Sequence, residues 1–289
     1  MSKKENSAKR VHENIFAFRC PLCESEMKVF DLKSMVCSNK HTFDFTKQGY
    51  VNLMTHQVNS QYSKELFEAR HKIIMNSHLY TTMHEAISKV IMEHLDLTKK
   101  SLRIIDLGCG EGSHLQSVLQ RFKENVTGVG LDIAKEGIVM AAKNYEEPIW
   151  LVGDLAKSPL ADQSFDVILN ILSPSNYKEF KRILVKNGLV IKVVPRPNYL
   201  KQLREALFED EDKKEYKNDQ TVELFKQHFR VLDTISISYT KRLTNEELSN
   251  LVQMTPLGWT ANQEHIEVFI YRHSVDITID LEILVGINE

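Results

Sequence analysis

The chain has 289 residues, of which 42% are hydrophobic and 26% are charged, and this globular balance excludes a disordered or fibrous protein. Its formal net charge of −2 argues against a typical nucleic-acid-binding protein, although the distribution of charge matters more than its sum. No apolar run approaches the roughly 18–20 residues of a membrane span, and four cysteines are too few for a disulfide scaffold, so we expect a cytoplasmic protein.

The first 17 residues are polar. Their start, MSKKENSAKR, is basic but no apolar core follows it, so it does not have the pattern of a secretory signal. We expect residues 1–17 to form a disordered N-terminal extension. Residues 1–75 carry 12 Lys/Arg and 8 Asp/Glu, a net charge of +4, which leaves −6 for the remainder. This modest excess favours a basic binding face, although surface charge also fluctuates along any sequence.

Four side chains that can bind a metal follow in two close pairs. Cys20 and Cys23 are separated by two residues, Cys37 and His41 by three, and thirteen residues lie between the pairs. Short turns can fold such pairs around one tetrahedral Zn²⁺, and four protein ligands leave no open position, so the zinc is expected to be structural. The alternative is a chance cluster of reduced cysteines. We interpret residues 18–55 as a zinc-binding module and Cys109 as a small buried residue.

A helical pattern follows the module. From Ser63 to Leu95, apolar residues such as Leu66, Ala69 and Ile73 recur at helical spacing. Residues 56–98 are therefore expected to form a helical linker.

Strand and helix patterns then alternate through the rest of the chain. The expected strands are LRIIDLG (102–108), VTGVGLDI (126–133), IWLVGD (149–154), FDVILNIL (165–172) and LVIKVVP (189–195). Helices are expected near 114–122, 135–144 and 176–184. This alternation predicts a doubly wound α/β sheet over residues 99–289. The run EDEDKK (209–214) is expected to be a charged loop or helix end. VLDTISISY (231–239) and HIEVFIYRH (265–273) are expected to be antiparallel strands flanking a helix at 244–253.

The strongest pattern is IIDLGCGEGSHL, residues 104–115. Its strand ends in Asp106 and is followed by Gly108, Gly110 and Gly112, which let the backbone turn sharply and approach a ligand closely. A dinucleotide-binding loop has the spacing G-x-G-x-x-G, whereas this loop reads G-x-G-x-G after an aspartate. S-adenosylmethionine has no phosphate but carries an ammonium group that an acidic strand end can neutralise. The loop therefore favours S-adenosylmethionine over a dinucleotide, or over a glycine loop without a ligand.

Two further acidic residues stand at expected strand ends. Asp132 can accept hydrogen bonds from both ribose hydroxyls of an adenosine. Asp154 is placed to meet the adenine edge, with Leu155 beside the ring. The expected cofactor-binding residues of the loop and these strand ends are Asp106, Gly108, Gly110, Gly112, Ser113, His114, Asp132, Asp154 and Leu155.

With these motifs in hand, the chain resembles the bacterial 23S ribosomal RNA guanine-N1 methyltransferases of the RlmA family. The matching pieces are FRCPLC, CSNKHTFDFTKQGYVNLM, LFEARHKII, HLYTTM, IIDLGCGEG and QMTPLGW (253–259). The resemblance implies a class I (Rossmann-like) S-adenosylmethionine-dependent methyltransferase fold with a small N-terminal zinc-binding module. It implies 23S rRNA as the partner, and allows a homodimer that widens an RNA-binding cleft. Cations near the zinc module, such as Lys47, Arg70 and Lys72, are expected to hold the RNA backbone.

The resemblance also implies two cofactor contacts from tyrosines. Tyr80 lies in the linker, where Thr82 replaces a proline common in relatives, and Tyr199 stands where some relatives carry histidine. The alternative at both positions is an ordinary half-buried aromatic.

The implied reaction is methylation of N1 of one guanine in a hairpin loop near the peptide exit tunnel. Such a base must be extruded, must lose its N1 proton and must be held in line with the methyl group. Asn170 and Ser173 are expected to orient the base, and no acidic residue is placed as proton acceptor. NILSP differs from the N-P-P-Y loop used for exocyclic amino groups, which agrees with a ring nitrogen. A small-molecule methyltransferase and a non-catalytic RNA-binding ribosome-assembly protein are the alternatives.

Overall fold

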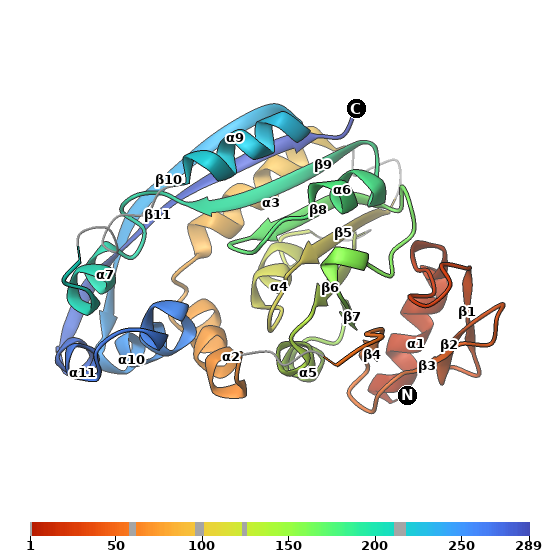
Figure 1. The fold of residues 1–289 in the computed structure, drawn as a ribbon, viewed down its shortest axis with the longest axis horizontal. Helices are drawn as coiled ribbons and strands as arrows, with labels where there is room; N and C mark the ends of the chain where they lie inside the picture. The colour runs from red at the N-terminus through yellow and green to blue at the C-terminus, as the bar shows by residue number, and fades with distance from the viewer. Residues whose placement is uncertain (1, 58–61, 96–100, 123–125, 211–217) are drawn as a thin grey trace.

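The computed structural model describes residues 2–57, 62–95, 101–122, 126–210 and 218–289. Within these residues the largest sheet has eight strands in the order β10-β11-β9-β8-β5-β6-β7-β4, as Figure 1 shows. No helix among the described residues is long and apolar enough to cross a membrane.

The centre of the sheet is parallel, and its five strands confirm the five that the sequence predicts. They are β5 (Leu102–Leu107), β6 (Val126–Asp132), β7 (Ile149–Val152), β8 (Phe165–Ile171) and β9 (Leu184–Pro195). An antiparallel pair, β11 (Ser274–Ile287) and β10 (Arg230–Thr244), extends the sheet beyond β9. The chain leaves β5 in one direction toward β6 and β7, and reaches β8 and β9 on the other side. The strand order therefore reverses between β5 and β8, where open α/β sheets bind their ligands.

Helices cover both faces of the sheet because neighbouring residues of each strand point to opposite sides. Ile104 packs in a cluster with residues of α3 (Thr81–His94), α4 (Ser113–Leu119) and α5 (Lys135–Asn144). Ile105 packs in the opposite cluster with residues of α6 (Tyr177–Ile183) and α9 (Asp219–His228). The α4, α5 and α6 helices correspond to the three expected at 114–122, 135–144 and 176–184.

The C-terminal part corrects one expected strand. HIEVFIYRH forms α11 (Gln263–Ile270) instead, because Ile266, Phe269 and Ile270 recur at helical spacing and the Asn262 side chain caps the helix by accepting from Glu264 N at 2.9 Å. The strand that pairs with β10 is β11, further along the chain. The helix expected at 244–253 is α10 (Asn245–Met254), and VLDTISISY lies within β10. Most of EDEDKK lies outside the described residues, which omit 211–217.

The N-terminus also differs from the expected disordered extension. Residues Lys3–Glu13 form α1, followed by a short 3-10 turn, η1 (Ile15–Ala17). Ser2 and Glu5 form a reciprocal capping box at its start, and Ala8 and Val11 are fully buried. These two apolar residues, spaced by one helical turn, give the otherwise polar helix a face that packs on the protein.

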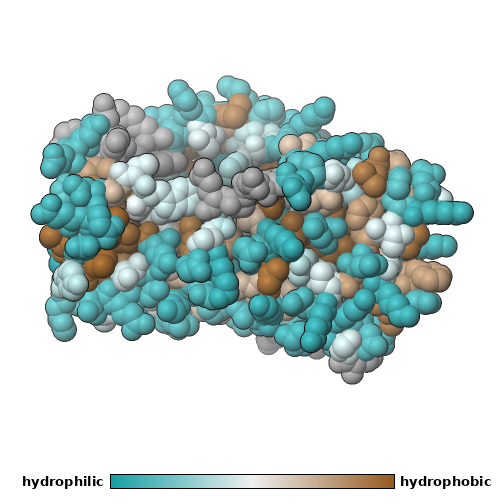
Figure 2. All heavy atoms as spheres, turned by 60° about the horizontal axis from the view of Figure 1, so that its bottom comes forward, coloured by the Kyte–Doolittle hydropathy of each residue, from teal (hydrophilic) through white to brown (hydrophobic). Residues whose placement is uncertain are grey.

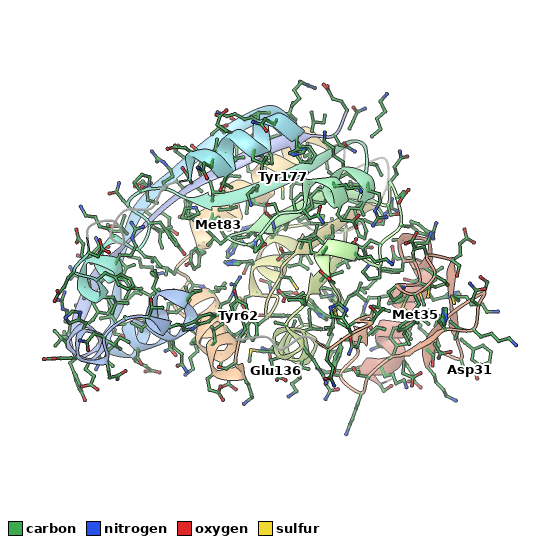
Figure 3. The ribbon with its side chains drawn as sticks, viewed as in Figure 1. Asp31, Met35, Tyr62, Met83, Glu136 and Tyr177 are labelled. Atoms are coloured by element: carbon green, nitrogen blue, oxygen red, sulfur yellow. The ribbon has the colours of Figure 1, made fainter. Side chains whose placement is uncertain are left out.

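The zinc module has its own three-stranded antiparallel sheet, formed by β1 (Met27–Phe30), β2 (Ser34–Cys37) and β3 (Thr42–Asp44). Figure 3 shows Asp31 at the outer turn of this sheet and Met35 inside the module, where Met35 is fully buried. The short β4 (Val51–Asn52) leaves the module and pairs in parallel with β7. β4 thus joins the module to the main sheet, and the core of the module is continuous with one face of that sheet.

The described part of the linker is helical and has three segments. They are α2 (Lys64–His71), the π-helical turn η2 (Lys72–Asn76) and α3; residues 58–61 and 96–98 of the expected linker lie outside the described residues. The α2 helix packs against α10. Figure 2 shows a mainly hydrophilic face with apolar side chains at its two ends, over the zinc module and over α7 (Lys201–Leu207), α10 and α11.

Candidate functional site

The structure brings the four expected zinc ligands together. The ligand atoms of Cys20, Cys23, Cys37 and His41 all lie within 4.8 Å of one another. Cys23 Sγ lies 3.7 Å from Cys37 Sγ, and His41 Nδ1 lies 3.4 Å from Cys20 Sγ. A tetrahedron with Zn–S bonds of 2.3 Å has edges of about 3.8 Å, so these separations fit a bound zinc ion.

Tight turns bring each pair of ligands together. Glu24 N donates to Cys20 O at 2.8 Å, and Lys40 N donates to Cys37 O at 2.9 Å. Glu24 and Lys40 both have positive φ, 60° and 65°, as such turns require. His41 N also donates to Cys37 Sγ at 3.3 Å, a contact that favours the thiolate form required of a ligand.

The glycine loop follows β5 at the point where the strand order reverses. Gly108, Gly110 and Gly112 have φ of 83°, 58° and 80°, which other residues adopt only at a cost. A Cβ on Gly108 would lie 2.6 Å from Ser173 Oγ, and one on Gly112 would lie 2.4 Å from the Trp150 ring. Gly108 therefore allows the loops after β5 and β8 to touch, whereas Gly112 allows the loop to pack on β7.

Asp106, at the end of β5, is a buried carboxylate that lacks a partner for one oxygen. It is 1% exposed, and its Oδ1 has no hydrogen-bond partner among the described residues. Burial raises the pKa of Asp106 to about 8. A ligand with a positive charge and N–H donors can supply the hydrogen bond and the counter-charge that this carboxylate lacks.

Asp132 lies across the loop from Asp106. Its Oδ2 accepts from Gly110 N at 2.7 Å and its Oδ1 from Ala134 N at 2.7 Å, while burial raises its pKa. Each oxygen keeps a second lone pair for a ligand hydroxyl. Asp154 accepts from Ala156 N at 2.7 Å and caps η3 (Leu155–Lys157); Asp154 and Leu155 are partly exposed.

Ser113 and His114 begin α4 and point into the protein. Ser113 Oγ lies 2.9 Å from Tyr145 Oη, and His114 Nδ1 lies 2.8 Å from His84 Nε2. Burial lowers the pKa of both histidines, that of His84 to about 3, so the pair is neutral and shares one N–H.

The two expected tyrosines meet. Tyr80 Oη lies 2.6 Å from Tyr199 Oη, and the Tyr80 ring packs edge-on against His114 with centroids 5.3 Å apart. Burial raises the pKa of Tyr80, and that of Tyr199 to about 12, so both hydroxyls stay protonated.

Arg70 is a functional-site residue whose place the sequence did not indicate. Sequence reasoning assigns it, with Lys47 and Lys72, to contact an RNA backbone. The structure places Arg70 Nε 2.8 Å from Glu111 Oε2, and the Glu111 side chain is completely buried behind the glycine loop. Lys47 and Lys72 are exposed.

A cavity of about 800 Å³ opens beside these groups, a size common for ligand sites. Tyr80, His114, Ser173 and Tyr199 line it, together with Leu172–Ser175 after β8, Lys192–Pro195 of β9, and residues of α7 and α9. Met254–Leu257 and Thr260 close another side, so QMTPLGW contributes to the cavity as well as ending α10.

Ser173 lines this cavity, and Asn170 is hydrogen-bonded to it within a larger network. Asn170 is fully buried; its Nδ2 donates to Leu107 O, Ser173 Oγ and Pro174 O at 2.6–3.1 Å. Asn170 Oδ1 accepts from Lys192 Nζ at 2.7 Å. Lys192 is the second residue that sequence reasoning missed, although a lone charge inside the apolar strand LVIKVVP was a signal that could have found it.

Two family models match the parts of the chain that hold these residues. Residues 18–64 match the family model described as RlmA, N-terminal, and residues 98–253 match one described as a methyltransferase domain. A Bacillus subtilis protein named as a candidate 23S rRNA (guanine-N(1)-)-methyltransferase is 40% identical over 274 residues, covering 94% of this chain and 97% of that protein. The chain belongs to the RlmA family.

A second relative in sequence and a solved structure are also similar to this RlmA-family protein. The 23S rRNA (guanine(748)-N(1))-methyltransferase of Streptomyces fradiae is 28% identical and covers 86% of this chain and 88% of its own length. A SAM-dependent methyltransferase structure from Aquifex aeolicus covers 79% of this chain and all of its own, with a TM-score of 0.50 at 14% identity, and supports the fold alone.

The cofactors of this RlmA-family protein are a structural zinc ion and S-adenosylmethionine. The cysteine and histidine ligand set fits the zinc, and the unpartnered Asp106 oxygen fits the ammonium group of S-adenosylmethionine.

Proposed function

We propose that this chain transfers a methyl group from S-adenosylmethionine to N1 of one guanine of 23S rRNA, in a hairpin loop near the peptide exit tunnel. The observation that carries the proposal is the relationship to the Bacillus subtilis protein, which spans both the zinc module and the methyltransferase domain. The relative from Streptomyces fradiae, whose name specifies guanine N1, supports the same target atom.

The cavity supports a flipped base as substrate. It lies next to the glycine loop and is lined by Leu172, Pro174 and Leu257, which can contact the faces of a base, and by hydroxyl groups that can contact its edges. Unstacked loop bases cost less to extrude and expose their Watson–Crick edge.

In the proposed reaction, S-adenosylmethionine supplies a methyl group on a sulfonium centre. We assign Asp106 to the cofactor's ammonium group and Asp132 to its ribose hydroxyls. Tyr80 and Tyr199 would form the wall between cofactor and base. Ser173, which lines the cavity and also donates to Leu107 O at 2.9 Å, would orient the base, with Asn170 holding Ser173 in place.

The experiment that tests the proposal is an analysis of methylated nucleosides. Unmodified 23S rRNA is incubated with the protein and labelled S-adenosylmethionine, then digested and separated by chromatography. We expect N1-methylguanosine as the labelled product. Label on N2 or N7 of guanine would contradict the proposed atom, and label in a small-molecule fraction of a cell extract would favour a metabolite substrate. RNA binding without any transfer would favour an assembly protein.

The proposal also includes a cellular location, a homodimer and cations that hold the RNA backbone. A ribosomal substrate implies a cytoplasmic location. The homodimer, which would widen the RNA-binding surface, can be measured by sedimentation with and without RNA. Lys47 and Lys72 are exposed cations that we assign to the RNA backbone, so affinity should fall as salt rises.

A further inference from the structure

A buried lysine lies at the base of the cavity in an otherwise apolar strand. Lys192 is 3% exposed, and its neighbours Ile191 and Val193 in β9 are fully buried. In parallel register it stands opposite Asn170 of β8. Burying an ammonium group costs free energy, so a lysine at this position calls for a compensating role.

The three partners that the structure gives to the Lys192 ammonium are all uncharged. Nζ donates to Asn170 Oδ1 at 2.7 Å, to Ser175 Oγ at 2.6 Å and to Ser173 O at 3.3 Å. The first two bonds are short and fix the position of the nitrogen. The third is long and weak, so this N–H can turn toward a better acceptor in the cavity.

The described residues that line the rest of the cavity carry positive or uncharged side chains. The titratable side chains that line it beside Lys192 are Arg70, Tyr80, His114, Tyr177, Tyr199 and Arg204. No Asp or Glu is among the described residues that line the cavity. Tyr177, labelled in Figure 3, comes from the start of α6, the helix that follows the loop after β8. A ligand that acquires negative charge here therefore meets a fixed cation and protonated hydroxyl groups.

We propose that Lys192 is a catalytic residue that contacts O6 of the target guanine and stabilises the negative charge on its O6–N1 amide when N1 loses its proton. This inference rests on the proposed function. The role is that of a preorganised cation, held by Asn170 and Ser175 before the substrate arrives.

The reaction balances with water as the proton acceptor. The N1–H bond breaks and its proton passes to water, leaving an anion shared by N1 and O6. N1 then forms a bond to the methyl carbon, the carbon–sulfur bond breaks, and its electron pair stays on sulfur. Lys192 remains an ammonium group throughout, and its charge is matched by the anion until the new bond forms.

A different role, in which neutral Lys192 takes the N1 proton, predicts a different response to substitution. Burial lowers the pKa of Lys192 to about 8, so the group is mostly charged at pH 7. If Lys192 acts through its positive charge, arginine can replace it in part. If Lys192 acts by accepting the N1 proton, arginine cannot replace it, because its guanidinium stays protonated.

The test measures single-turnover methylation of a 23S rRNA fragment by the full-length wild-type protein and by Lys192→Met, Lys192→Arg and Lys186→Met. Lys186 lies in the same strand but is exposed, which makes it the matched control. We expect Lys192→Met to slow the reaction by about 100-fold or more. Lys192→Arg should recover part of this loss, and Lys186→Met should match the wild type. Affinity for S-adenosylmethionine, measured by calorimetry, should be unchanged in all three variants.

Two readouts separate a catalytic from a purely structural role. Wild-type activity should stop rising above about pH 8, where Lys192 loses its charge, whereas activity of Lys192→Arg should continue to rise. A target 6-thioguanine forms its N1 anion more easily than guanine does, so the ratio of wild-type to Lys192→Met rates should shrink on that RNA.

The inference would be overturned if Lys192→Met slowed methylation of the guanine and 6-thioguanine RNAs by the same factor. It would also be overturned if Lys192→Met were as active as the control variant Lys186→Met. If Lys192→Met fails to bind S-adenosylmethionine, the decision passes to the pH profile of Lys192→Arg, where complete inactivity would equally overturn it. A wild-type protein that makes no N1-methylguanosine would refute the proposed function instead, so the two failures are distinguishable.

Discussion

Tyr80 and Tyr199 are separated by 118 intervening residues, yet their hydroxyl oxygens lie 2.6 Å apart at the wall of the cavity. Tyr80 precedes α3 of the linker, and Tyr199 lies in the turn after β9, where its N–H donates to Arg196 O. The hydroxyl pair thus connects the linker to the end of the sheet that borders the glycine loop. This contact explains why both residues belong to the candidate site.

The Tyr199→Phe variant tests the hydroxyl pair. It leaves the buried Tyr80 hydroxyl without this partner, so we expect unfolding free energy to fall by about 1–3 kcal/mol and cofactor affinity to weaken severalfold. Tyr271→Phe, at a side chain that is 81% exposed, is the control. Chemical denaturation and calorimetry provide the two measurements, and no change in either would show that the hydroxyl pair has no such role.

Asp106 predicts a dependence of stability on pH. Its pKa in the folded protein, about 8, lies above the ordinary value of 3.8, so its contribution to stability is complete below about pH 4 and is lost as pH rises through 8. Asp106→Asn should therefore raise the melting temperature of the cofactor-free protein at pH 8, relative to wild type, and weaken cofactor binding. Asp233→Asn, on the exposed face of β10, should do neither. A lower melting temperature for Asp106→Asn at pH 8 would contradict this account.

The Arg70–Glu111 ion pair predicts that substitutions of the two residues affect the free energy of unfolding in a strongly non-additive way. Removing Arg70 leaves a completely buried carboxylate without its cation, so Arg70→Gln should cost about 3–5 kcal/mol of stability. The double variant Arg70→Gln/Glu111→Gln should recover much of that loss. Denaturant melts of the four proteins give the coupling energy, and purely additive effects would argue against the pair.

Loss of zinc should affect more than the module itself. Cys37→Ser should abolish zinc binding, measured by elemental analysis, and should lower the melting temperature of the whole chain because β4 pairs with β7 and the cores are continuous. Cys109→Ala removes a buried cysteine outside the cluster and should keep the zinc. Zinc retained by Cys37→Ser would exclude the proposed ligand set.

The sequence was informative where the relevant pattern is local. The strands, the glycine loop and the pairs around Cys20 and Cys37 each depend on residues close together in the chain. HIEVFIYRH was misassigned because its β-branched and aromatic residues favour a strand, while the cap at Asn262 and burial of Phe269 select a helix.

Other parts of the site depend on long-range contacts that no local pattern carries. Arg70 is predicted to hold an RNA backbone because it is a cation near the zinc module, whereas its pairing with Glu111 follows only from the packing of α2 on the glycine loop. The N-terminal helix has only two buried apolar residues in a polar segment, too few to indicate packing. Lys192 becomes meaningful only once β8 and β9 pair and bring Asn170 opposite.

The most direct test of the central claim is reverse transcription of 23S rRNA after treatment with this protein. A methyl group on N1 blocks the Watson–Crick edge, so reverse transcriptase should stop one nucleotide before the modified guanine. We predict one new stop, in a hairpin loop, that requires S-adenosylmethionine and is absent with Gly110→Val, since valine cannot easily adopt the φ of 58° found there. Complete read-through of RNA treated with zinc-loaded wild-type protein and cofactor would contradict the account.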